Sequence, residues 1–250
     1  EAMIAIFKKE FLQFFGQIVG YASIALFILL TGLYVWVFPS YSVLEQTILS
    51  LEPFFTWAPI FLILVVSAAT MRQFAEESAE GTLELLVTKP LSSSQIVFGK
   101  YLAVVSIVAM TLLLTAITYV PSVQALALEG VSLDYGSITG AYLGLFLLGM
   151  TFSAVGLFTS ILVRSQMVSF LLSGTINLIA YIGFELLAEK KQFAGYWDYI
   201  IEGLGCKAHY ESISLGLLDV GDIFYFIALI ITFLSLAIMV VQRWPYLKQL

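Results

Sequence analysis

YLAVVSIVAMTLLLTAITYV, residues 101–120, contains no charged side chain. Twenty largely apolar residues are the length that an α-helix needs to cross the hydrocarbon core of a bilayer. Five more charge-free stretches of comparable length occur, at residues 18–37, 54–71, 137–163, 167–184 and 223–241. None of the six shows the period-two alternation of a membrane β-strand. The sequence therefore predicts an all-α, polytopic membrane protein with six transmembrane helices.

The composition of the chain agrees with this prediction. Of its 250 residues, 60% are hydrophobic and 11% are charged, whereas a soluble domain carries about 45–50% apolar and about 25% charged residues. Intrinsic disorder is excluded as well, because it requires low hydrophobicity and a high density of charge. The net charge of −6 comes without the clustered Lys and Arg of a phosphate-binding surface, so we expect no nucleic-acid partner.

The chain has no recognisable nucleotide site. Gly99 and Lys100 resemble the end of a phosphate-binding loop, but Ser94 stands where that motif needs its first glycine. Tyr101 stands where the motif needs Ser or Thr. We therefore expect no cofactor in this chain and a source of energy in another one.

Catalytic and metal-binding groups are also scarce. The only strongly polar residues of the predicted spans are Asn177 and, at one span end, Glu185, and proton-coupled carriers need ionisable groups inside the membrane. Cys206 and His209 form a C-x-x-H pair without the second pair that structural zinc requires. The sequence predicts neither an enzyme nor a metal site.

The basic residues are distributed unevenly among the connections. Three of them lie in the last loop of one side, which also holds many acidic residues, and eight lie on the other side: Lys8, Lys9, Arg72, Lys89, Lys100, Arg164, Arg243 and Lys248. Cytoplasmic loops carry the excess of Lys and Arg. The sequence therefore predicts that both termini are cytoplasmic.

The N-terminal arm, residues 3–16, has an amphipathic pattern. Ile4, Phe7, Phe11 and Phe15 recur at helical spacing, with Lys8 and its charged neighbours opposite. This pattern is typical of a helix that lies in the membrane interface.

The connection at residues 72–100 predicts two short helices. Glu76 and Glu77 lie in the first, and Gly81 ends it. The second begins near Thr82 and continues with Leu83, Glu84, Leu85 and Leu86. The three leucines form its apolar side. Ser92 and Gln95 have the spacing of a capping box that starts the third span. A short amphipathic helix of this kind fits a cleft on a soluble partner, with the leucines buried and the glutamates facing basic residues; a solvated loop is the alternative.

Two further patterns leave alternatives open. The loop at residues 188–222 is rich in aromatic residues and glycines, which favours either a re-entrant hairpin or a helix on the outer surface. Gly140 and Gly144 form a G-x-x-x-G motif, which permits close helix packing inside the bundle or against a second subunit.

Two segments resemble the signature regions of type-2 ABC exporter permeases. They are TMRQFAEESAEGTLELLVTKPL at 70–91 and HYESISLGLLDVGDIFYF at 209–226. From MIAIFKKEF at 3–11 onward, the whole chain is similar to the gliding-motility permease subunits of the GldF type. One departure is Ser78-Ala79-Glu80, where relatives often carry basic residues.

The resemblance implies one transmembrane permease domain, residues 3–250, in a bacterial inner membrane. It assigns residues 3–16 as the connecting helix, 72–100 as the coupling loop and 188–222 as re-entrant helices. The implied partners are a dimer of cytoplasmic ABC ATPase subunits, which bind ATP and Mg, and a second permease subunit, a different chain with an extracytoplasmic domain. A force-transmitting anchor without a transported substrate is the alternative function.

Overall fold

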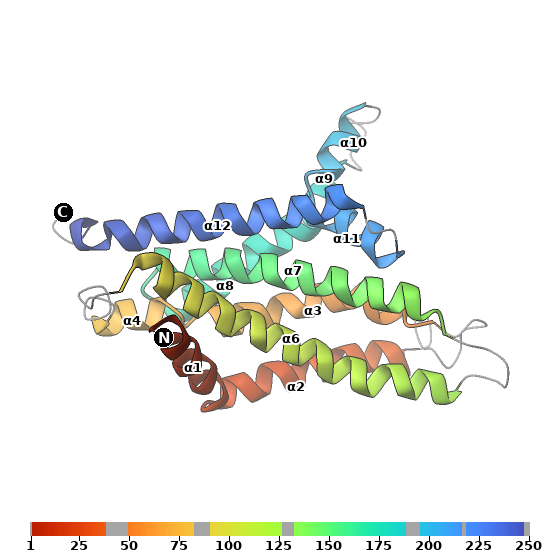
Figure 1. Ribbon diagram of the computed structural model, residues 1–250. Helices are drawn as coiled ribbons and strands as arrows, with labels where there is room; N and C mark the ends of the chain where they lie inside the picture. Colours follow the sequence, from red (N-terminus) through yellow and green to blue (C-terminus); the bar gives the residue numbers. More distant parts are fainter. Residues whose placement is uncertain are drawn as a thin grey trace.

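The computed structural model describes residues 2–38, 50–82, 91–126, 133–188, 196–216 and 219–247. Regular structure within these ranges is entirely helical (Figure 1). In chain order the helices are α1 (Ala2–Phe15), α2 (Ile18–Gly32) with its π-helical continuation η1 (Leu33–Val37), α3 (Glu52–Thr70), α4 (Ala75–Glu80), α6 (Ser93–Leu126), α7 (Tyr135–Leu162), α8 (Gln166–Leu178), η2 (Ile179–Gly183), α9 (Phe184–Ala188), α10 (Tyr196–Glu202), α11 (Cys206–Ser214) and α12 (Val220–Leu247).

Six helical segments in the described ranges are long and apolar enough to cross a membrane, which confirms the predicted fold class. They are Ile18–Val37, Glu52–Glu80, Ser93–Leu126, Tyr135–Leu162, Gln166–Ala188 and Val220–Trp244. Each contains one of the charge-free stretches almost entirely. The third extends furthest beyond its stretch, because α6 begins at Ser93 and thereby places Lys100 inside the helix.

The start of α6 follows the predicted capping box. The backbone N–H of Ser92 donates to Gln95 Oε1 at 3.1 Å, and the backbone N–H of Gln95 donates to Ser92 Oγ at 3.3 Å. These reciprocal bonds satisfy donors that a helix N-terminus leaves unpaired. Local sequence thus fixes where this helix begins.

The core of the bundle lies between α3 and α7, the two most buried spans. Glycines on α7 bring the neighbouring helices close: a Cβ on Gly149 would lie 2.7 Å from Val108 of α6, and a Cβ on Gly156 would lie 2.4 Å from Thr70 of α3. Small residues favour membrane helix packing in this way, because they let backbones approach. The outer spans α2, α8 and α12 are mostly unburied within the chain.

A line of buried polar groups joins α3, α7 and α8. Ser67 Oγ donates to Ser173 Oγ at 3.2 Å, and Asn177 Nδ2 donates to the Phe152 carbonyl at 3.3 Å. All of these side chains have no exposed surface. The side-chain amide of Asn177, a strongly polar group in an apolar span, therefore links α8 to α7.

Figure 1 shows α1, α4 and the end of α12 at one end of the bundle, and α10 and α11 at the other. We call these the α4 end and the α11 end. The start of α1 and the last turn of α12 lie at the same end, as an even number of spans requires.

The α11 end contains most of the predicted re-entrant segment. Helix α11 lies against α7: a Cβ on Gly140 would lie 3.2 Å from the Ile213 carbonyl, and one on Gly144 would lie 3.0 Å from the Ile213 side chain. Tyr210 is buried, and its hydroxyl donates to the Phe55 carbonyl at 2.8 Å. Gly140 and Gly144 thus allow α11, a short helix of the same chain, to pack closely on α7. The depth of the segment in a bilayer stays a prediction.

Candidate functional site at the α4 end

The N-terminal arm is a helix, as its pattern predicts. The rings of Phe7, Phe11 and Phe15 follow one another along α1, with centroid distances of 5.9 and 5.0 Å. Ile4 on the same side is half exposed. On another face, Ile6 is buried, and a Cβ on Gly99 would lie 3.0 Å from it. Helix α1 therefore packs directly on the start of α6.

The ammonium group of Lys100 lies at the centre of the site, on a side chain with no exposed surface. Its Nζ donates to Glu10 Oε1 of α1 at 2.7 Å and to the Gln73 carbonyl, in the turn after α3, at 2.6 Å. Glu77 Oε2 of α4 lies 3.0 Å from the same nitrogen. A buried charge is tolerated only when it is paired and hydrogen-bonded. One buried cation thus joins α1, α4 and α6.

A second ammonium group, that of Lys9, closes the cluster from outside. Its Nζ lies 2.8 Å from Glu77 Oε1 and 3.3 Å from Glu10 Oε1. Burial alone would lower the pKa of Lys9, but the hydrogen bond to Glu77 and the charge of Glu10 outweigh burial and raise it. Two cations therefore balance two carboxylates, and we call these four residues, Lys9, Glu10, Glu77 and Lys100, the ion cluster.

Helix α4 is held from two further directions. Ser160 of α7 accepts hydrogen bonds from the backbone N–H groups of Phe74 and Ala75, both at 3.1 Å. Because the first N–H groups of a helix have no partner inside it, Ser160 satisfies donors at the start of α4. The guanidinium of Arg72 pairs with Glu76, with Nε 2.9 Å from Oε2.

The end of α4 is set by Gly81. Its φ is +73°, in the left-handed region that glycine adopts without steric cost. This confirms the helix break that the sequence predicts. Thr82 follows, and its hydroxyl donates to the Glu77 carbonyl at 3.4 Å.

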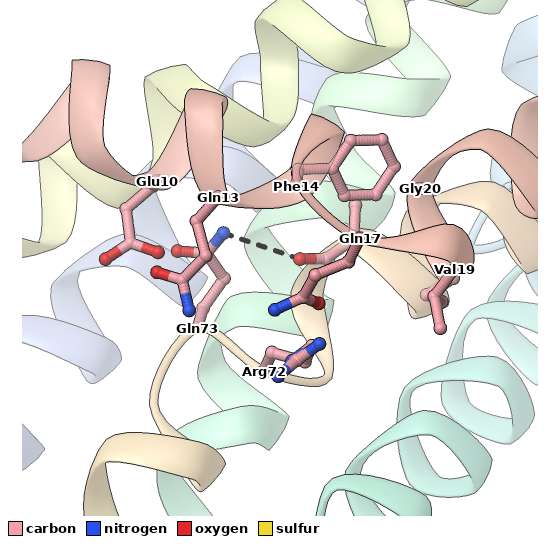
Figure 2. Close-up of a pocket in the computed structure, with 10 residues that line it drawn as sticks. Glu10, Gln13, Phe14, Gln17, Val19, Gly20, Arg72 and Gln73 are labelled. Carbon is pink, nitrogen blue, oxygen red and sulfur yellow. Dashed lines mark hydrogen bonds between the residues drawn. The ribbon is translucent and has the colours of Figure 1, made fainter.

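A groove of about 260 Å³ lies between α1 and α4. Its lining is almost wholly polar: Lys9, Glu10, Gln13, Arg72, Glu76, Glu77, Glu80 and Thr82. A smaller hollow adjoins it, shown in Figure 2, with Glu10, Gln13 and Gln17 from α1 and the turn after it, and Arg72 and Gln73 from the turn after α3. The two segments that the sequence singled out thus face one another across one charged groove.

The eight residues predicted for the coupling interface divide into two groups. Glu76, Glu77, Gly81 and Thr82 lie together beside α1, but Glu77 is nearly buried and bound within the chain, so its charge is not free to meet a partner as expected. The other four, Leu83, Glu84, Leu85 and Leu86, lie outside the described residues.

The sequence analysis did not identify the partners within the ion cluster. In the sequence, Lys100 is a basic residue of a connection and the end of an incomplete phosphate-loop pattern, and Glu10 lies on the polar face of the arm. One signal was present: Glu10 follows Ile6 by four residues and therefore shares its helix face. Nothing local connects residue 10 or 77 with residue 100, because those contacts are made by tertiary packing.

A family model described as "ABC-2 family transporter protein" matches residues 4–196. This is more than half of the chain, and it includes the ion cluster and the groove. No curated protein matches the chain at a significant level. In this family the membrane component is not itself catalytic and works with an ABC ATPase. The chain therefore belongs to the ABC-2 family of transporter proteins and is a multi-pass membrane permease.

Proposed function

We propose that this chain is the permease subunit of an ATP-driven complex, in which a separate cytoplasmic ATPase dimer docks at the α4 end. Hydrolysis of ATP by that partner would move the α4 segment and, with it, the transmembrane helices. The result is either export of a substrate or movement of an extracytoplasmic partner in gliding motility.

The observation that carries this proposal is the ion cluster. The fully buried ammonium group of Lys100 is bound to three other segments, an attachment that a loop serving only to connect two spans does not require. In this chain Lys100 ties α4 to α1 and α6, and Ser160 ties it to α7. A displacement imposed on α4 is therefore passed to α1 and to two spanning helices, because all of them contact it through fixed polar bonds.

The finer parts of the proposal rest on the sequence. The eight-to-three distribution of basic residues supports a cytoplasmic α4 end in a bacterial inner membrane. Resemblance to the GldF type supports a second, different permease chain with an extracytoplasmic domain. An anchor subunit that transmits force without a substrate would use the same α4 end.

Co-purification tests the docking proposal. Leu85 belongs to the predicted apolar side of the coupling helix, and buried apolar anchors carry most of the binding energy at interfaces. Leu85→Asp should therefore abolish recovery of an ATPase chain with the permease extracted from its native membrane. Leu204→Asp is the matched control, because Leu204 is 56% exposed and lies between α10 and α11.

Two outcomes decide the docking proposal. Loss of the ATPase from Leu85→Asp alone supports docking at the α4 end. Equal recovery from both variants would overturn it. If the ATPase is retained by the wild-type chain, measuring substrate flux and movement of the partner chain in ATP-loaded vesicles separates export from force transmission.

A further inference from the structure

A second and larger cavity is lined by residues of the α11 end. The helices of that end lie at the opposite end of the bundle from α1 and α4 (Figure 1). The volume of the cavity is about 820 Å³, and it is open on one side. Its walls come from the starts of α3 and α7, from η2 and α9, and from α11. Small-molecule sites in proteins have volumes of about 300–1,000 Å³. We call this space the α11 cavity.

The charged side chains of the α11 cavity are predominantly acidic. Among the residues that the structure describes, the cavity is lined by four carboxylates and one ammonium group: Glu52, Asp134, Glu185 and Glu211 against Lys207. Lys207 is already engaged, because its Nζ contacts Glu185 Oε1 and lies 3.6 Å from Glu211 Oε1. The described lining side chains therefore have a net charge of −3, so a cation that enters is attracted to them while an anion is repelled.

Most of the uncharged lining is apolar or aromatic, with four Ser and Thr hydroxyl groups among it. Phe55 and Trp57 of α3, Tyr181 of η2 and Tyr210 of α11 all contribute to the wall. Tyr210 is held in place by its bond to the Phe55 carbonyl, and its ring lies 6.3 Å from that of Tyr181. Aromatic faces attract cations, and they bind quaternary ammonium groups in particular.

We propose that the α11 cavity binds an organic cation with an apolar body. The volume is far larger than an inorganic ion requires, the aromatic wall suits an apolar body, and the surplus carboxylates select positive charge. A neutral lipid would satisfy the wall but leave the carboxylates without a counter-charge. The proposal concerns binding by this chain and does not depend on the ATPase partner, although in a permease such a ligand is a candidate substrate.

The test compares two probes of the same shape and opposite charge. Tetraphenylphosphonium and tetraphenylborate are added to the purified full chain in a neutral detergent, and binding is measured by equilibrium dialysis against protein-free micelles. The phosphonium should bind saturably to one site. The borate should show only the partitioning into micelles that the blank shows.

Three variants locate the site. Glu211→Gln removes a lining carboxylate that is 55% exposed, so the fold should tolerate it, and it should weaken phosphonium binding about tenfold. Lys207→Gln removes the one cation among the described lining residues and should strengthen binding several-fold. Glu202→Gln makes the same charge change at an exposed position of the α11 end that does not line the cavity, and it should leave binding unchanged.

Glu211→Gln should weaken phosphonium binding and Lys207→Gln should strengthen it, while Glu202→Gln should not change it. This combination distinguishes binding in the α11 cavity from attraction by the overall surface charge. Saturable binding of the borate equal to that of the phosphonium would overturn the proposal. So would equal effects of Glu211→Gln and Glu202→Gln. A thermal melting curve for each variant in the same detergent identifies any loss of binding that comes from unfolding.

Discussion

Replacing Lys100 by Met would remove the central cation of the ion cluster while keeping most of the side-chain volume. The side chains of Glu10 and Glu77 are only 7% and 12% exposed. Together with the Gln73 carbonyl, they would lose the ammonium group that they now contact. Removing one partner of a buried ion pair costs about 3–5 kcal/mol, because the remaining charge stays desolvated. Lys9 still pairs with both carboxylates, so we expect the lower limit, about 3 kcal/mol.

Lys9→Met is the matched control, since it makes the same change next to the same two carboxylates. The Lys9 side chain is 55% exposed, and exposed ion pairs contribute about 0–1 kcal/mol. The two lysines therefore differ mainly in burial. If burial of Lys100 is the reason, Lys100→Met should lower the free energy of unfolding several times more than Lys9→Met does.

The assay is unfolding of the purified chain by titration of SDS into mixed micelles, followed by circular dichroism. A third variant, Lys100→Met combined with Glu10→Gln and Glu77→Gln, removes the unpaired charges together and should recover most of the lost stability. The reasoning is refuted if Lys100→Met costs no more than Lys9→Met, or if the triple variant is less stable than the single one.

Two other predictions follow from packing and from the single thiol. Gly156→Val should destabilise the fold by about 1–3 kcal/mol in the same titration, because its Cβ would meet hydroxyl groups of α3 and α8 at 2.4 and 2.8 Å. Gly174→Ala, whose Cβ would have no neighbour nearer than 3.6 Å, should change stability much less; similar losses would contradict the predicted packing. Cys206 is buried, and burial raises the pKa of its thiol to about 11, so an impermeant maleimide should leave the native wild-type chain unlabelled at neutral pH. On that silent background, a cysteine at Ser122 should react from outside intact cells and one at Ser92 only after permeabilisation, and the reverse pattern would invert the proposed orientation.

The features of this protein that depend on neighbours in the chain could be predicted from the amino-acid sequence. Charge-free runs of about 20 residues specify spanning helices, because an unpaired backbone and an ionised side chain are both costly in hydrocarbon. The break at Gly81 and the capping box of Ser92 and Gln95 were equally readable, since each involves groups at most three residues apart. Membership of the ABC-2 family followed from linear motifs and was confirmed by the family match.

Which polar groups meet one another depends on tertiary packing and could not be predicted from the sequence. Lys100 lies 90 residues from Glu10 and 23 from Glu77, and no periodicity connects positions so far apart. In the sequence Lys100 is one more basic residue at a helix end, where exposure to water is the ordinary outcome. It is buried instead because α1 folds back on α6, where Ile6 packs against Gly99. Likewise, Gly140 and Gly144 predict a close helix contact but do not identify the partner helix. The absence of a side chain leaves space for any helix that packs at that position.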